Sequence, residues 1–366
     1  MATPKQKTRS DYSVAIFCAM DLERNAVRYM LDNEHKRLPA VEGDSNSYIV
    51  GDLHGHNVVL ACLPGQQGKG AAATVATNTS RSFPSIKWRI FVGIGGGVPS
   101  VHNDIRLGDV VISMPEGQHG GVVQYDLGKE TTNSVFELKG FLWPPPPRLR
   151  NAAQDMHSDH LVQDNKAEEY LQAMLRKGRR LAIYHKPSEP DVLFEESYHH
   201  PQGAGVCAGH CDLSRIINRP AREEPGPEFH YGLIASGDRV IKNAEIRDYI
   251  AREAGRDVLC FEMEAAGLLT EFSSIVIRGI SDYADSHKNS SWQHYAAATA
   301  AACTKELLSY VDPEVVVVEP APGSPGSPGS LSAPKSTRGG NVFTGQGVQN
   351  IGGGNVSIGR DFRINR

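Results

Sequence analysis

Two acidic segments, each preceded by an apolar stretch, are the strongest chemical signal in the sequence. Residues 261–267 read Phe-Glu-Met-Glu-Ala-Ala-Gly, and Asp282 follows Glu264 by eighteen residues, at the end of an Arg-Gly-Ile-Ser-Asp segment. The apolar stretches 258–261 and 275–280 predict buried strands. Because ligands of an α/β sheet collect at the carboxyl ends of its strands, we expect both carboxylates in one site.

The two carboxylates suit different chemical roles. Glu264 can accept hydrogen bonds from both hydroxyls of a ribose diol, with Met263 against the sugar face. A partly desolvated Asp282 can donate a proton to N7 of a departing adenine. Together these roles predict cleavage of a purine–ribose bond. Taken singly, Glu262 and Glu264 also fit acids at a helix start, and Asp282 fits an exposed turn.

Two further segments fit the same chemistry. Glu23 follows the first apolar stretch in Ala-Met-Asp-Leu-Glu and could orient a water opposite the base, or be an ordinary acid in the first turn of a helix. Consecutive glycines at 95–97 follow the apolar stretch 88–94 and would let a ligand approach the backbone. Their spacing is not the dinucleotide-binding fingerprint, and a structural turn is the alternative.

Apolar stretches and amphipathic stretches alternate along the chain, which predicts an α/β sheet covered on both faces. Residues 51–56 read as the connection of a hairpin. The expected strands are 14–19, 47–50, 57–63, 88–94, 109–114, 230–235, 258–261 and 275–280, and the expected helices are 23–31, 70–83, 155–180, 244–253, 265–272 and 292–311.

Changes in composition predict four regions. Residues 1–11 read as a flexible leader and 12–312 as the folded domain, with an insertion at about 143–229 that is rich in Pro, His and Gly. Such a long connection predicts a mobile lid over the site. A Pro/Gly/Ser linker follows at 313–340, and a Gly/Asn-rich tail at 341–366.

Composition excludes several function classes. The 366 residues carry a net charge of −4 without a long basic stretch, so no nucleic-acid partner is expected. No run of about 20 apolar residues predicts a membrane span, and the first eleven residues lack the apolar core of a signal peptide. Six cysteines in mostly apolar contexts indicate a reducing compartment. We therefore expect a cytoplasmic protein.

Taken together, these motifs resemble the purine nucleoside phosphorylase/uridine phosphorylase superfamily over about residues 12–311. The most similar group is the phosphorylase-like domain of fungal immune-receptor-like proteins. The resemblance implies a three-layer α/β/α fold around a mixed, partly barrel-like central sheet, and a homo-oligomer, a dimer or larger. It implies no metal and no organic cofactor. The supporting segments are 19–23, 93–99, 107–111, 236–238, 261–267 and 279–289.

The resemblance also implies roles for single residues. Glu23 matches the acid that activates water in the nucleosidases of methylthioadenosine and adenosylhomocysteine, Glu264 the ribose-binding acid, and Asp282 the general acid. Phosphorylases carry a Gly-Asp-Pro segment and an arginine near the first of these positions, so hydrolysis is favoured. A phosphate-dependent phosphorylase and a non-catalytic nucleotide-sensing assembly module remain as alternatives. The other expected substrate-binding residues are Met263, Glu262, Gly95, Gly96, Val240 and Ile241.

The substituent at the ribose 5′ position is a separate question. Basic side chains lie near the motif segments, and Arg and Lys clamp phosphates. We therefore expect a nucleotide substrate, with ATP cleaved to adenine and ribose triphosphate by an immune or cell-death effector. Arg24 and Arg89 are the named candidates within the wider set of Arg24, Lys69, Arg81, Lys87, Arg89, Arg106 and Lys242.

The tail and the insertion each carry one more expectation. Asn, Gln and β-branched residues with little charge favour cross-β stacking, so the tail 341–366 is similar to amyloid signalling motifs and predicts a receptor partner; a disordered tail is the alternative. In the insertion, zinc binding is disfavoured because the spacing lacks a strong finger pattern. The residues that would bind zinc are His199, His200, Cys207, His210 and Cys211.

Overall fold

The computed structural model describes residues 7–132, 136–203, 207, 209–223, 226–254 and 257–313. Of the expected leader, residues 1–11, the structure therefore describes residues 7–11. The expected linker beyond residue 313 and the Gly/Asn-rich tail lie outside the described residues, as does the amyloid prediction made for that tail.

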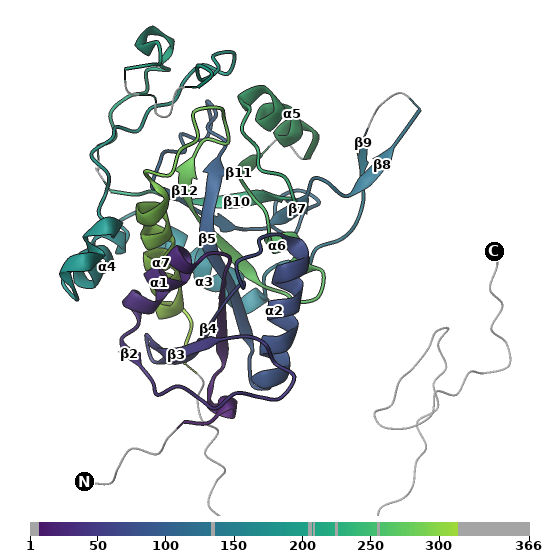
Figure 1. The fold of residues 1–366 in the computed structure, drawn as a ribbon, viewed down its shortest axis with the longest axis vertical. Coiled ribbons are helices and arrows are strands. Elements are labelled where there is room, and N and C mark those ends of the chain that lie inside the picture. Colours follow the sequence, from purple (N-terminus) through teal and green to yellow (C-terminus); the bar gives the residue numbers. More distant parts are fainter. Residues whose placement is uncertain are drawn as a thin grey trace, which may run out of the picture. The chain divides into compact units, whose positions relative to one another are not determined.

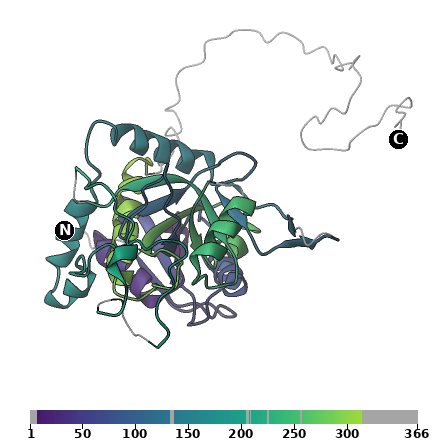
Figure 2. The same ribbon diagram turned by 90° about the horizontal axis from the view of Figure 1, so that it is seen from above.

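Ten strands of the described residues form one mixed sheet, in the order β11-β10-β6-β12-β5-β1-β4-β3-β2 with β7 beside β10 (Figure 1). A separate hairpin of β8 and β9 extends from the body of the domain (Figure 2). The bounds are β1 Val14–Cys18, β2 Asn33–Glu34, β3 Tyr48–Leu53, β4 His56–Cys62, β5 Trp88–Gly97, β6 Val110–Ser113, β7 Val122–Gln124, β8 Gly128–Glu130, β9 Phe136–Leu138, β10 Phe229–Ser236, β11 Val258–Glu262 and β12 Ile275–Asp282.

The sheet is parallel at its centre and closes on itself at one end. β1 lies parallel between β4 and β5, and β5 is parallel to β12. The sheet continues through β6 and β10 to β11, which pairs with β5 at Gly96 and Gly97. The five strands β5, β12, β6, β10 and β11 thus form a ring, as the expectation of a partly barrel-like sheet requires.

Helices cover both faces of the sheet, which gives the expected three layers (Figure 1). α1, α3, α4 and α7 share one apolar core on one face, and α2 and α6 share a second core on the other. α5 packs with the end of the sheet in a third, smaller core. The bounds are α1 Asp21–Met30, α2 Lys69–Ser82, α3 Pro147–Asp159, α4 Ala167–Leu175, α5 Ala244–Ala254, α6 Ala265–Leu269 and α7 Gln293–Ser309, with short 3₁₀ segments at Arg9–Asp11, Arg179–Tyr184 and Leu213–Arg215.

The sequence pattern accounts for these elements. Every residue of β1 is buried, which explains its continuous apolar run, because helices cover both of its faces. α1 buries Glu23, Ala26, Val27 and Met30, positions that share one face of a helix. No helix in the described part of the chain is long and apolar enough to cross a membrane.

Three expectations about local structure need correction. Strands β3 and β4 extend into the expected connection 51–56, and only His54 and Gly55 turn, with φ of 47° and 78°. The glycines at 95–97 belong to strand β5 and do not form a turn, because β11 and β12 pair with them. The expected helix 155–180 is two helices, α3 and α4, because residues 160–166 turn between them.

The expected insertion at 143–229 has two parts with different structures. Its first half contains α3 and α4, which bury Leu149, Met156, Leu171 and Met174 in the core they share with α7. This half is therefore part of the domain rather than a lid. Its second half, in the described residues between 186 and 228, is irregular apart from a short 3₁₀ segment and one bridge between Phe194 and Ile216.

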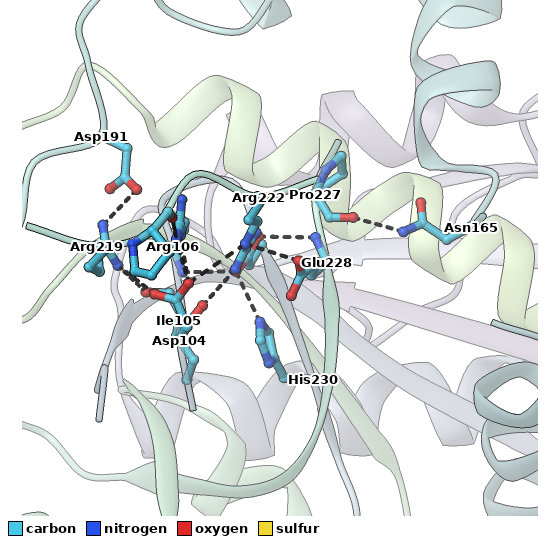
Figure 3. Close-up of polar contacts among 12 residues, drawn as sticks. Asp104, Ile105, Arg106, Asn165, Asp191, Arg219, Arg222, Pro227, Glu228 and His230 are labelled. Carbon is cyan, nitrogen blue, oxygen red and sulfur yellow. Dashed lines mark hydrogen bonds and ion pairs between the residues drawn. The ribbon is translucent and has the colours of Figure 1, made fainter. Parts of the chain in front are cut away.

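Buried ion pairs tie the end of the second half to the sheet (Figure 3). Arg222 bonds both oxygens of Asp109 at 2.6 and 2.7 Å, and Asp109 also contacts His230 Nε2 at 2.9 Å. Burial alone would raise the pKa of Asp109, but the Arg222 and His230 hydrogen bonds hold that pKa below its usual value. Arg219 pairs with Asp104 and Asp191. These ion pairs therefore hold the backbone near Arg219 and Arg222 against the sheet.

Candidate active site

The carboxyl ends of β1, β5, β11 and β12 converge on a cavity of about 170 Å³. Glu23 reaches it from the first turn of α1, and Glu264 from the residue before α6. A larger cavity of about 840 Å³ lies away from these strand ends, against α3, α4 and the start of β10. The smaller cavity is lined by Ala19, Met20, Glu23, Gln67, Ile94, Gly95, Gly96, Arg239, Val240, Ile241, Phe261, Glu262, Met263, Glu264, Ser281, Ala284, Lys288 and Gln293.

Glu23 is a buried carboxylate held by the backbone. Its Oε2 accepts hydrogen bonds from the N–H groups of Ala19 and Met20 at 2.8 and 2.9 Å, and its Oε1 accepts one from Ile94 at 2.9 Å. Burial raises the pKa of Glu23, while the Arg278 charge and the three N–H groups act in the opposite direction. The geometry therefore presents an oriented carboxylate whose basicity is increased by burial.

Arg278 is fully buried behind the cavity, beside the carboxylates of the site. It forms an ion pair with Glu262, and its Nη2 lies 3.9 Å from Glu264 Oε2. Its guanidinium also lies 4.3 Å from the centre of the Phe91 ring. One positive charge thus serves three carboxylates, since its field also reaches Glu23.

Glu262 and Glu264 lie two residues apart but have different surroundings. Glu262 accepts hydrogen bonds from the N–H groups of Glu264 and Ala265, so it caps the start of α6 as well as pairing with Arg278. Glu264 accepts one long hydrogen bond, 3.3 Å, from the Gly68 N–H. Burial first, then the nearby Glu262 charge, raises the pKa of Glu264 to about 7. Glu264 is therefore the carboxylate with capacity left for a ligand.

Asp282 ends β12 and lies between this cavity and a second one. Its Oδ1 accepts the Ala284 N–H at 2.9 Å, and its Oδ2 contacts Ser281 Oγ at 2.8 Å and Lys288 Nζ at 2.9 Å. Asp282 lines the neighbouring cavity of about 240 Å³, whereas Ser281 and Lys288 line both cavities. The expected acid is thus adjacent to the site and paired with a cation.

Glycines on β5 make room for these polar groups. A Cβ at Gly93 would overlap Arg278 Nη1 and lie 2.6 Å from Glu23 Oε1, because Arg278 pairs with Gly93 in the strand register. A Cβ at Gly96 would lie 2.8 Å from Asp282 Oδ1. Side chains at these two positions would therefore displace the charged groups of the site.

The structure brings some expected residues together and leaves others apart. Gly95, Gly96, Val240, Ile241 and Met263 all line the cavity and, with Met20 and Phe261, give it an apolar part.

Arg24 and Arg89 are not among the residues that line the cavity. Arg24 lies on α1, and Arg89 lies at the start of β5, opposite the end that carries Gly95, with its guanidinium over Phe272. Other basic candidates are already paired. Lys69 contacts Asp126 at 2.7 Å and Asp238 at 3.3 Å, and Arg106 contacts Asp104 at 2.6 Å.

Site roles were not predicted for Arg278, Ser281 and Lys288, nor for Gln67 and Gln293 on the cavity wall. A signal for Arg278 is present in the sequence, because a charged residue inside the apolar stretch 275–280 must find a buried partner. Lys288 carries no comparable signal, since it stands among other polar residues in a loop.

Comparison with known proteins agrees with the fold. Residues 13–181 match the family model described as Phosphorylase superfamily. A nucleotide-binding leucine-rich repeat (NLR)-like protein of Hyaloscypha variabilis is 40% identical over 307 residues, which cover 84% of this chain and 30% of that protein. The chain thus spans about 30% of the length of this relative. Residues 13–181 are thus similar to the phosphorylase superfamily, the group that the motifs of the chain resemble.

Solved structures resemble this fold at low sequence identity. The 5′-methylthioadenosine/S-adenosylhomocysteine nucleosidase of Neisseria meningitidis, in complex with methylthio-immucillin-A, is 21% identical with a TM-score of 0.53, over 81% of this chain and 98% of that one. The futalosine hydrolase of Helicobacter pylori is 16% identical with a TM-score of 0.52, over 82% and 99%. At this identity the likeness establishes the nucleoside phosphorylase-like fold.

Proposed function

We propose that this chain hydrolyses the N-ribosidic bond of an adenine nucleoside or nucleotide. The observation that carries the proposal is the arrangement of three carboxylates at the carboxyl ends of three strands: Glu23 and Glu264 line a cavity with an apolar part, and Asp282 lies beside that cavity. The solved structures with this fold include two kinds of nucleosidase, which supports the same reaction class here.

Each carboxylate has a distinct part in the proposed reaction. Glu264, when ionised, accepts hydrogen bonds from the ribose hydroxyls and holds the sugar against Met263. As the bond between C1′ and N9 breaks, its electron pair moves to the base, and Asp282 supplies the proton to N7. Water adds to C1′, and Glu23 takes its proton. The products are free adenine and the ribose derivative.

The proposal requires a change at Asp282 when the base binds. In the structure Lys288 Nζ lies 2.9 Å from Asp282 Oδ2, so an ion pair occupies this oxygen. To act as an acid, Asp282 must hold a proton, so the base must displace Lys288 or turn the carboxylate toward the cavity. Ser281 Oγ, 2.8 Å from the same oxygen, remains as a partner.

We further propose that the substrate is a nucleotide, with ATP as the first candidate. Arg239 and Lys288 line the cavity and replace Arg24 and Arg89 as the cations best placed for a 5′ phosphate group. A guanidinium and an ammonium on the cavity wall favour an anionic 5′ group over an apolar thioether.

Chromatography of free base tests the reaction class and the substrate together. Purified protein is incubated with ATP, adenosine or methylthioadenosine, each with and without phosphate. Adenine released from ATP without phosphate supports a nucleotide hydrolase. Release that depends on added phosphate would establish the phosphorylase instead. Tight adenine-nucleotide binding with no base formed would establish the non-catalytic sensing module.

The biological setting completes the proposal. The NLR-like relative supports a role as an immune or cell-death effector that works as a homo-oligomer and meets a receptor through the tail 341–366. All six cysteines are free in the structure, which supports a cytoplasmic location because disulfides are rare there.

Deletion of residues 340–366 tests the tail: it should abolish assembly and leave base release by the remaining chain intact.

A further inference from the structure

Three potential metal ligands gather in the second half of the insertion. One ligand atom each of His200, Cys207 and Cys211 lies within 4.8 Å of the other two, and all three side chains are half-buried. Cys207 shares a cavity with Asp282, whereas none of the three residues lines the cavity of Glu23 and Glu264. Ligand atoms within this limit can bind one ion after a small shift of their side chains.

Local structure explains why the two thiols share one side of the chain. The N–H groups of His210 and Cys211 both donate to the Cys207 carbonyl at 3.0 Å, which brings the backbone of Cys211 close to that of Cys207. His200 is oriented as well. Its Nδ1 lies 3.1 Å from the Pro201 carbonyl, and since a carbonyl only accepts, Nδ1 carries the proton and Nε2 keeps a free lone pair.

A fourth side chain provides independent evidence for a ligand. His287 is 8% exposed, and neither ring nitrogen has a hydrogen-bond partner among the described residues. Buried polar groups without partners are rare and costly. The ring is stacked on Phe194 at 4.1 Å, lies 5.5 Å from the His200 ring centre, and lines the same cavity as Cys207. An ion in this cavity would satisfy the ring.

The chemistry of the donors selects zinc. Two thiolates and two imidazoles form a tetrahedral set that Zn²⁺ prefers, whereas Mg²⁺ and Ca²⁺ prefer oxygen. Two imidazoles on one tetrahedral zinc have ring centres roughly 5 Å apart, given Zn–N bonds near 2.1 Å. The separation of 5.5 Å between His200 and His287 fits this geometry. Asp285 Oδ2, 3.7 Å from His287 Nδ1, could accept a hydrogen bond from that nitrogen after a small shift once Nε2 binds metal.

We propose that this chain binds one structural Zn²⁺ through His200, Cys207, Cys211 and His287. Binding releases one proton from each thiol, because the metal takes thiolates. The ion would join the second half of the insertion to the loop that follows β12 and carries Lys288. A direct hydrogen bond already links these segments, from His200 N–H to Ser286 Oγ at 2.9 Å. The proposal departs from the expectation of no metal, which rested on the Cys-x3-Cys spacing alone.

Metal analysis of the full chain, purified without an affinity tag or chelator, tests the site directly. The expected result is about one zinc per chain. The variants Cys207→Ser, Cys211→Ser, His200→Ala and His287→Ala should each reduce the zinc content or weaken zinc binding by at least tenfold. The matched controls are His199→Ala and His210→Ala, because both imidazoles are exposed in the same segment. Equal loss in the controls would contradict the assignment.

Replacement of zinc by Co²⁺ tests the ligand set without any variant. Tetrahedral cobalt with two thiolates gives strong thiolate-to-metal charge-transfer absorption together with visible bands. Protein that binds neither ion in reducing buffer with all thiols titratable would overturn the proposal, as would a Cys207–Cys211 disulfide in freshly isolated protein. Full zinc affinity in a folded His287→Ala variant would show that His287 is not the fourth ligand.

Discussion

Arg278 Nη2 lies 3.9 Å from Glu264 Oε2 inside a wall that water does not reach. The same guanidinium pairs with Glu262 and faces Glu23. This wall of the cavity thus holds one cation and three carboxylates. The excess of buried negative charge lowers the free energy of unfolding. Such an arrangement is typical of a site organised for binding or catalysis rather than for maximal stability.

The variant Glu264→Gln should raise stability while it removes activity. The folded-state pKa of Glu264, about 7, lies above its ordinary value of 4.5. The native protein therefore binds more protons between those two pH values, and the contribution of Glu264 to stability is present below pH 4.5 and lost as pH rises through 7. Urea unfolding at pH 8 should show the variant more stable by about 1–3 kcal/mol.

At pH 4.5 the same comparison should show no gain, because Glu264 is then mostly protonated in the native protein. The control Glu271→Gln changes an exposed glutamate nearby and should show no pH-dependent difference. A Glu264→Gln protein that is less stable than the parent at pH 8 would contradict the excess of buried negative charge.

The pH dependence of base release should have an acidic limb near pH 7. Ribose hydroxyls donate to Glu264 only when it is ionised, and its pKa of about 7 means that the site loses this acceptor as pH falls. We expect kcat/KM to fall about tenfold per pH unit below that value. A profile that is flat from pH 5 to pH 8 would show that Glu264 does not bind the sugar in its ionised form.

The variant Asp282→Asn should lose base release by about 10²- to 10⁴-fold, because an amide cannot donate the proton that N7 needs. Ala284 N–H and Ser281 Oγ can still contact the amide, so the fold should persist, as circular dichroism would show. Asp312→Asn serves as the control, since that side chain is 83% exposed in a surface ion pair. Full turnover by Asp282→Asn would remove Asp282 from the reaction.

The variant Arg222→Ala should destabilise the domain by about 3–5 kcal/mol, because it leaves the fully buried Asp109 without its bidentate partner. Arg215→Ala removes a surface pair with Glu195 in the same insertion and should cost less than about 1 kcal/mol. Chemical denaturation measures both. Equal, small effects would mean that the network in Figure 3 does not anchor the insertion.

Gly93→Ala should destabilise the protein by about 1–3 kcal/mol, since the added methyl group would overlap Arg278 Nη1 and crowd Glu23. Gly70→Ala provides the opposite comparison. Gly70 lies in α2, and a methyl group added there would point into open space, so alanine should stabilise by about 0.5–1 kcal/mol through helix propensity. Thermal unfolding of the two variants should therefore shift in opposite directions.

Strand patterns were sufficient to predict most of the fold and the location of the site. β1, β11 and β12 read as apolar runs, and a carboxylate close after each run reached the same edge of the sheet. Glu23 and Glu264 line one cavity for that reason. The orientation of Asp282 was not predictable, because its partner Lys288 lies in a loop whose path depends on packing.

Charge partners were the least predictable feature. Lys69 and Arg106 stand near motif segments in sequence, yet acids up to 169 residues away in the chain bind Lys69. Arg89 stands on a strand of the site, but at the end remote from it. The position of a residue in the sequence predicts on which face and near which end of a helix or strand it lies. Its ion-pair partner depends on which other elements the fold brings close to it.

The close contact between α2 and α6 has a consequence for how Glu264, the proposed ribose-binding carboxylate, is held. Gly267 touches the Lys69 carbonyl so closely that no side chain fits, and the neighbouring Gly68 N–H bonds Glu264. A displacement of the first turn of α2 should therefore shift the Glu264 carboxylate as well. A fluorophore attached to the outer surface of that turn should therefore report sugar binding. A partner protein that bound α2 should change the position of Glu264 and with it the rate of the proposed reaction.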